Sequence, residues 1–64
     1  MKNELNTLQE LSFISSWWKE DNKYFVDVDS DQGKLLLYTR GFIPIRKIPR
    51  GVTGERLIMM RENE

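Results

Sequence analysis

The chain has 64 residues, no cysteine and no histidine, and its ten acidic side chains balance its ten basic ones. Without cysteine it cannot be a disulfide-stapled domain or a thiolate zinc protein. Without histidine it lacks the commonest general base and metal ligand. A chain of this length has room for one small core, with little space for an enclosed catalytic cleft. We therefore expect a single domain over residues 1–64 that is not an enzyme and carries no cofactor.

Unbroken apolar runs in the sequence are at most four residues long, as at 35–38 and 57–60. A helix needs about 20 apolar residues to span a bilayer, and no signal-peptide pattern precedes the first charges. We expect no membrane partner and, by default, a cytoplasmic location.

Residues 4–19 carry large apolar side chains three or four positions apart, which places these side chains on one stripe of a helix. The segment 7–10, Thr-Leu-Gln-Glu, fits a capping box, and the polar pair at 21–22 ends the pattern. We expect a helix over about residues 4–19 with a buried stripe of Leu5, Leu8, Leu11, Ile14 and Trp18.

Residues 23–29 and 34–40 have the pattern of a β-hairpin. The first segment alternates polar and apolar residues, residues 30–33 are typical turn formers, and the second segment is rich in Leu and Tyr. If the loop holds four residues, counting outward from it gives the pairs of residues that lie opposite each other. This register is self-consistent, because a slip by one residue would move the apolar side chains to the wrong face. The inner face, covered by the helix, then holds Tyr24, Val26, Val28, Leu35 and Leu37.

The C-terminal third predicts two further strands. Residues 42–48 are apolar and β-branched, but Pro44 removes a ladder donor, so we expect an edge strand or a broken one. Residues 48–51 form a good turn around Pro49. Residues 55–61 have helical propensity, yet an isolated helix of two turns is weak, so we prefer a strand there and keep the helix as the alternative.

These elements together predict an α+β fold, with the N-terminal helix packed on a three- to four-stranded antiparallel sheet. A small SH3-like β-barrel with an N-terminal helix is the alternative. If the helical stripe is right, Leu11→Ala should cost about 2–5 kcal/mol of stability.

Aromatic side chains indicate a first candidate contact surface on the predicted helix. Trp17 points about 100° away from Trp18, so it would lie at the edge of the packing face with Phe13 one turn back. There it either closes the rim of a small core or contacts a partner, since interfaces favour Trp and Phe.

A second candidate surface is the sheet face turned away from the helix. In the predicted register, Phe25, Leu36 and Tyr38 share that face with several basic residues. Aromatic side chains among basic ones can stack the bases of single-stranded nucleic acid. Alternatively, the C-terminal segment covers these side chains, or they seal a dimer.

The alternating Asp27, Asp29 and Asp31 resemble a calcium loop only superficially. An EF-hand loop needs glycine at its sixth position and glutamate at its twelfth. Counted from Asp27, these positions hold Gln32 and Tyr38. We interpret the segment as a solvated turn and expect no metal site.

Charge is divided unevenly along the chain, with a net −4 over residues 1–32 and +4 over residues 33–64. The arginine-rich half could contact phosphate or an acidic protein surface, but the neutral total charge of the chain argues against general attraction to nucleic acid.

We expect a small non-enzymatic regulator or accessory module, of a kind frequent in phages and mobile elements, that binds a protein partner. A nucleic-acid-binding module is the alternative, and a two-fold homodimer is left open. The candidate contact residues are Phe13, Trp17, Phe25, Tyr38, Arg40, Arg46, Lys47, Arg50 and Arg56.

Overall fold

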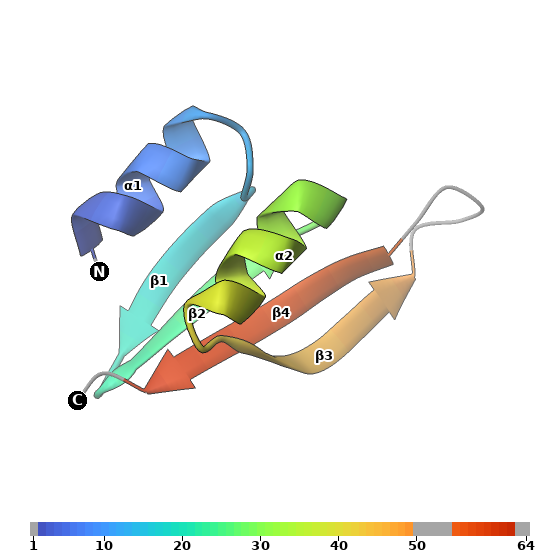
Figure 1. Ribbon diagram of the computed structural model, residues 1–64. Helices are drawn as coiled ribbons and strands as arrows, with labels where there is room; N and C mark the ends of the chain where they lie inside the picture. The colour runs from blue at the N-terminus through green and yellow to red at the C-terminus, as the bar shows by residue number, and fades with distance from the viewer. Residues whose placement is uncertain (1, 50–54, 63–64) are drawn as a thin grey trace.

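The computed structural model describes residues 2–49 and 55–62, which form two helices and four strands (Figure 1). The strands make one antiparallel sheet in the order β1-β2-β4-β3, and both helices lie on the same face of it. The predicted α+β fold, with an N-terminal helix on a four-stranded antiparallel sheet, is confirmed, and the sheet is open rather than an SH3-like barrel. In chain order the elements are α1 (Lys2–Glu10), β1 (Ser16–Glu20), β2 (Lys23–Val28), α2 (Asp31–Thr39), β3 (Ile43–Pro49) and β4 (Glu55–Glu62).

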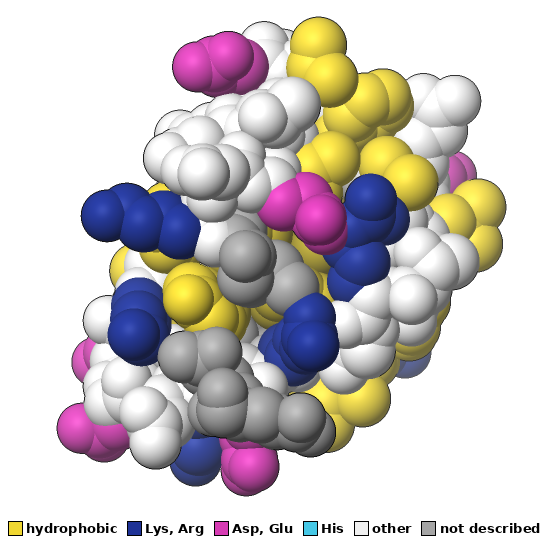
Figure 2. All heavy atoms as spheres, turned by 60° about the vertical axis from the view of Figure 1, so that its left-hand side comes forward, with side chains coloured by type: hydrophobic (Ala, Val, Ile, Leu, Met, Phe, Trp, Pro, Cys, Tyr) yellow, Lys and Arg dark blue, Asp and Glu magenta, His cyan; other side chains and the backbone are white. Residues whose placement is uncertain are grey.

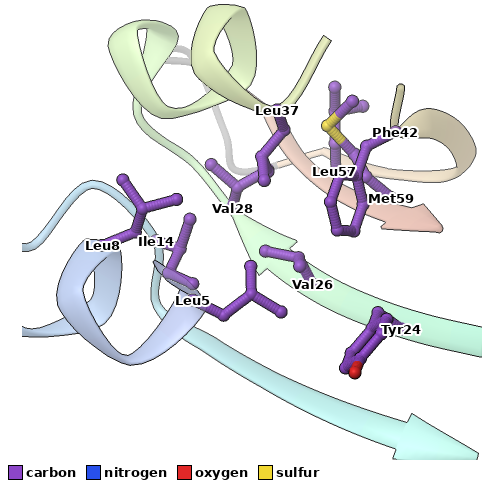
Figure 3. Close-up of a cluster of buried hydrophobic side chains, with 10 residues drawn as sticks. All are labelled: Leu5, Leu8, Ile14, Tyr24, Val26, Val28, Leu37, Phe42, Leu57 and Met59. Carbon is purple, nitrogen blue, oxygen red and sulfur yellow. The ribbon is translucent and has the colours of Figure 1, made fainter. Parts of the chain in front are cut away.

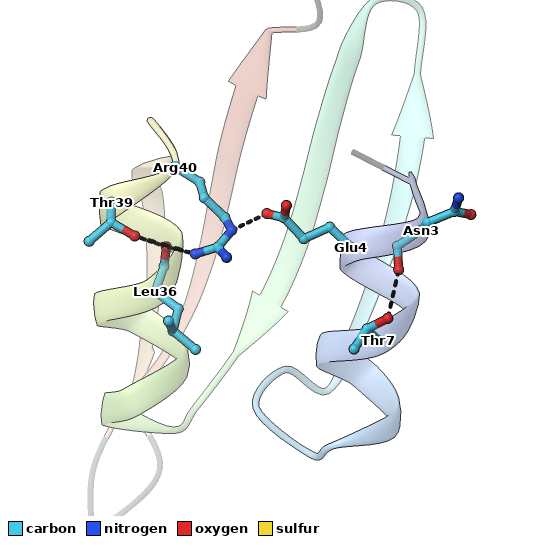
Figure 4. A network of polar contacts seen from close by, with 6 residues as sticks. All are labelled: Asn3, Glu4, Thr7, Leu36, Thr39 and Arg40. Atoms are coloured by element: carbon cyan, nitrogen blue, oxygen red, sulfur yellow. Dashed lines mark hydrogen bonds and ion pairs between the residues drawn. The ribbon is translucent and has the colours of Figure 1, made fainter.

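The topology consists of two α-β-β halves, α1-β1-β2 and α2-β3-β4. In each half, a helix of nine residues precedes two consecutive antiparallel strands. The second strands of the halves, β2 and β4, pair antiparallel at the middle of the sheet, and α1 and α2 run in opposite directions (Figures 1 and 4). The halves are therefore related by an approximate two-fold axis through the β2–β4 pair.

The helix predicted over residues 4–19 is wrong in its second half, because α1 ends at Glu10. The Ser12 backbone is left-handed, with φ of 65°. Its N–H donates to the Gln9 carbonyl at 3.1 Å, and the Phe13 N–H donates to the Leu8 carbonyl at 2.9 Å. This pair of bonds is the Schellman arrangement that closes a helix. A serine occupies the position that is usually glycine, so the sequence carried no obvious stop signal.

Residues 16–20, predicted as helix, form β1 instead. A two-residue turn at 21–22, in which Asp21 has φ of 54°, reverses the chain into β2. Because side chains alternate across a strand, Trp18 points away from the helices and is 38% exposed rather than buried in the core. Leu11 lies beyond the end of α1 and is 61% exposed. The large loss expected for Leu11→Ala therefore does not apply.

Residues 34–40, predicted as the second strand of a hairpin, lie in α2 and at its C-terminal cap. Ser30 is the N-cap, and its hydroxyl accepts a hydrogen bond from the Gly33 N–H at 3.3 Å. The predicted pairing of this segment with β2 is wrong, because β2 pairs with β1 and β4. Of the predicted inner-face residues in this segment, Leu37 is buried from α2, whereas Leu35 is 66% exposed.

We expect Ser30→Ala to destabilise the protein by about 0.5–2 kcal/mol, because it removes the side chain that satisfies a free N–H in the first turn of α2. Urea denaturation followed by circular dichroism measures this loss. Ser15→Ala is the control, since Ser15 is exposed and lies outside every helix and strand, and it should change stability by less than about 0.5 kcal/mol. Equal midpoints for the two variants would contradict the capping role.

The hydrophobic core lies between the helices and the sheet (Figure 3). Val26 and Met59, which are cross-strand neighbours at the centre of the sheet, are fully buried. The predicted buried face of 23–29 is thus confirmed, while its predicted partners are replaced by residues of β4. The core residues are Leu5, Leu8, Ile14, Tyr24, Val26, Val28, Leu37, Phe42, Leu57 and Met59.

The two C-terminal strands follow the prediction. β3 is an edge strand, and a bulge between Pro44 and Arg46 interrupts its pairing. Residues 55–61 belong to a strand, not a helix, and this strand lies inside the sheet. The predicted turn at 48–51 extends beyond the described residues.

Candidate interaction surface

The sheet face opposite the helices is not covered by any described residue (Figure 1). Because Tyr24, Val26 and Val28 point toward the helices, the intervening residues of β2 and their cross-strand neighbours point the other way. We call this surface the open face. It consists of Ser16, Trp18, Glu20, Lys23, Phe25, Asp27, Ile43, Arg46, Ile48, Arg56, Ile58, Met60 and Glu62.

An apolar row crosses the open face from one edge of the sheet to the other. Trp18 of β1 lies opposite Phe25 of β2, Phe25 lies opposite Met60 of β4, and Met60 lies opposite Ile43 of β3. The rings of Trp18 and Phe25 are stacked, with centroids 5.5 Å apart and planes 10° from parallel. Trp18 is 38% exposed and Ile43 is 55% exposed. A connected apolar surface of this kind is typical of an interaction site.

Charged side chains border the apolar row on both sides. Glu20, Lys23 and Glu62 are cross-strand neighbours beyond one side of the row. Beyond the other side lie the remaining charged residues, Asp27, Arg46 and Arg56. Three acids and three bases bring the formal charge of the open face to zero.

Asp27 and Arg56 form an ion pair on the open face. Asp27 Oδ1 lies 3.0 Å from Arg56 Nε, but these two atoms make no hydrogen bond with each other or with another described residue. The Asp27 side chain is only 17% exposed. Charge neutralisation between two mostly buried groups therefore holds this pair together, and Arg56 is already engaged within the chain.

The structure brings three of the predicted contact residues to the open face: Phe25, Arg46 and Arg56. Tyr38 and Leu36, predicted to share a face with Phe25, lie on α2 instead. Sequence analysis missed the actual neighbours of Phe25. The strand predicted over 55–61 was a usable signal for Ile58 and Met60, because alternate residues of a strand point to the same face of the sheet. Trp18 was not predicted on this face, because the helix expected over residues 4–19 placed its side chain in the core.

Trp17 and Phe13 lie on the helix side of the sheet. The Trp17 indole N–H donates to Asn6 Oδ1 of α1 at 3.1 Å, and the centroids of the Trp17 and Tyr24 rings are 6.2 Å apart. Both residues are half-buried and pack against the core, and Phe13 lies in the loop after α1 rather than one helical turn before Trp17. Trp17 thus joins α1 to the sheet.

Arg40 connects the two helices (Figure 4). Its Nε donates to Glu4 Oε1, and its Nη1 donates to the Leu36 carbonyl at 3.3 Å. Glu4 lies in the first turn of α1 and Arg40 caps the C-terminal end of α2, so each charge also interacts favourably with its own helix dipole. In the same view the Thr7 hydroxyl donates to the Asn3 carbonyl at 3.0 Å. Thr7 therefore lies inside α1 and does not begin a capping box.

Of the two remaining predicted residues, Lys47 is exposed and lies opposite Leu57, on the helix side of β3. Arg50 is outside the described residues.

A second apolar surface lies on the helix side of the molecule. Phe13, Gln32, Leu35 and Leu36 line a groove of about 330 Å³ between α2 and the loop that follows α1. Figure 2 shows hydrophobic side chains gathered in a band on one face of the molecule, with basic side chains around its lower half. The groove is wide and shallow, and it offers one polar side chain for orienting a ligand.

The comparisons with known proteins do not assign this chain to a family. No family model, curated protein or solved structure matches it.

Within residues 2–49 and 55–62, no three His, Cys, Asp or Glu side chains lie close enough together to hold a metal ion. Neither of the two described helices has the length and apolar composition needed to cross a membrane. The open face is the surface of the described residues that carries a connected row of apolar side chains from one edge of the sheet to the other.

Proposed function

We propose that this protein is a non-enzymatic regulator or accessory module of the cytoplasm, which acts by docking a protein on its open face. The observation that carries the proposal is the apolar row of Trp18, Phe25, Met60 and Ile43, uncovered by any described residue and bordered by charges that cancel. Protein interfaces have this composition, with an aromatic and aliphatic centre and a polar rim.

The same observations favour a protein over single-stranded nucleic acid as the partner. A nucleic-acid platform needs excess positive charge for the phosphates and ring faces that are free for the bases. On the open face the acids equal the bases, and Arg56 is already paired with Asp27. Trp18 and Phe25 use one ring face each to stack on one another.

Site-specific photo-crosslinking tests the proposal. A photoreactive amino acid replaces Trp18 in cells that naturally make the protein, and a second version carries it at Leu35, which is 66% exposed on α2. We expect an adduct of defined mass from position 18 that resists nuclease and is destroyed by protease, with no such adduct from position 35. Failure to form an adduct at position 18, or equal adducts at both positions, would overturn the proposal.

A binding measurement tests the nucleic-acid alternative directly. We expect labelled single-stranded DNA and RNA to show no change in fluorescence anisotropy with the protein, even at about 50 mM salt, where phosphate contacts are strong. Steeply salt-dependent binding that is weakened by Arg46→Ala but not by Lys47→Ala would contradict the protein-docking proposal. The two variants remove one positive charge each, from opposite faces of β3.

A further inference from the structure

We infer that the protein docked on the open face is a second copy of this chain, so that the functional unit is a two-fold dimer of two sheets packed face to face. This inference rests on the proposed function and names its partner. Two-fold dimers are the commonest assembly of soluble proteins, and two sheets that pack face to face share a core about 10 Å thick.

A two-fold dimer requires one surface to fit itself, and the apolar row meets that requirement. For a two-fold axis that runs along the row, the row of one copy lies on the row of the other. For an axis parallel to the strands between β2 and β4, Phe25 lies over Met60 of the second copy, and Trp18 lies over its Ile43. Apolar residues meet apolar residues in both arrangements.

The charges around the row are also self-complementary. Lys23 and Asp27 each lie two residues from Phe25, in opposite directions along β2. An axis along the row therefore places Lys23 over Asp27 of the second copy. Lys23 is also the cross-strand neighbour of Glu62, so an axis parallel to the strands places it over Glu62 of the second copy. Neither arrangement sets two like charges of the open face against each other.

The size of the open face indicates a weak dimer. Four strands about 4.8 Å apart, with three to four residues of each on the face, span roughly 400 Å², about half of what one partner contributes to a standard interface. We expect a dissociation constant of about 1–100 µM, which corresponds to the low end of specific interfaces.

Sedimentation equilibrium of the full chain from about 0.5 to 500 µM, a range that brackets that constant, tests the inference. We expect the mean mass to rise from the 7.7 kDa of the monomer toward twice that value. Ile43→Lys should raise the dissociation constant at least about tenfold, because it buries an unpaired charge in the interface. Leu35→Lys makes the same change at a similarly exposed position on α2 and should leave the constant unchanged.

A charge reversal provides a second pair of variants that touches no apolar side chain. Lys23→Glu should weaken the dimer severalfold, and Lys47→Glu, at an exposed position on the helix side of β3, should not. Circular dichroism of each variant verifies that it is folded. Concentration-dependent amide shifts in NMR spectra, confined to β1–β4 and absent from α2, would locate the contact independently.

The outcomes separate this inference from the proposed function. A dimer that is lost in Ile43→Lys and retained in Leu35→Lys supports both. A monomer at every concentration, or a dimer that is equally affected by the two variants, overturns the inference. If the dimer inference fails in this way but position 18 crosslinks to a different protein, the proposed function still stands. A monomer that also gives no adduct at position 18 overturns both.

Discussion

Replacing Gly33 with alanine is expected to unfold the protein, although alanine is the better helix former by about 1 kcal/mol. Gly33 is buried in the first turn of α2, where its backbone lies against the loop after α1. An added Cβ would overlap the carbonyl oxygen of Phe13 and lie 2.8 Å from Val28 Cγ2. The Phe13 carbonyl is backbone, and it cannot rotate away as a flexible side chain would. The helix must therefore move and open the core.

We expect this displacement to cost more than about 3 kcal/mol, as severe overpacking does. A domain of this size has only about 3–10 kcal/mol of stability in total. Gly41→Ala is the matched control. Gly41 has φ of +86°, but an added Cβ there would meet only the Arg61 side chain, at 3.8 Å, so the cost is backbone strain of about 1–2 kcal/mol. Urea denaturation that ranks Gly41→Ala as the more damaging change would show that α2 does not lie this close to the loop.

Phe42→Ala should cost about 3–5 kcal/mol and leave most of the protein unfolded at 37 °C. Phe42 is the largest fully buried side chain and is 1% exposed. It lies three residues beyond the end of α2, and its backbone N–H donates to the Leu37 carbonyl at 3.0 Å. That bond holds the Phe42 backbone against the end of α2, and the ring is buried in the core between α2 and the sheet, so alanine would leave a cavity there.

Thermal denaturation followed by circular dichroism measures this loss, with two comparison variants. Phe42→Leu keeps most of the volume and should cost less than about 1.5 kcal/mol. Tyr38→Ala removes an aromatic side chain that is 49% exposed on α2 and should also have a small effect. A melting temperature for Phe42→Ala close to that of Tyr38→Ala would place Phe42 outside the core.

The sequence predicted the fold class and the strands β2, β3 and β4 because their signals are local. Alternation at 23–28 identified the buried face of β2, and Pro44 identified β3 as an edge strand. The assignment of 55–61 depended on the weakness of a short isolated helix, and the structure agrees. Alternation, a proline and the short length of a segment were therefore enough to identify these three strands.

The errors arose where the apolar residues of a segment fit more than one kind of element. The apolar residues from Leu5 to Trp18 fit a helix, but the left-handed Ser12 ends α1, and residues 16–20 form the strand β1. The run 35–38 was interpreted as a strand because it is apolar, yet it lacks β-branched residues and follows a good N-cap at Ser30. Leucine favours helices over strands, and that weak preference was the available correction.

The candidate surface could be predicted only in part, because it depends on which strands are neighbours. Phe25 was assigned to the uncovered face correctly from the alternation within β2. Its neighbours Trp18 and Met60 come from strands 7 residues before it and 35 after it, and only the sheet order brings the three together. No local pattern encodes that order.

The position of β4 in the sheet has a consequence for how the protein folds during synthesis. β4 is the last of the six described elements along the chain, yet it lies inside the sheet, between β2 and β3. Until residues 55–62 have left the ribosome, β2 and β3 have no strand between them, and the apolar side chains of α2 have only half a sheet to pack on. We therefore expect the nascent chain to remain unfolded until the end of this segment emerges, and then to fold in a single step whose rate is limited by long-range strand pairing.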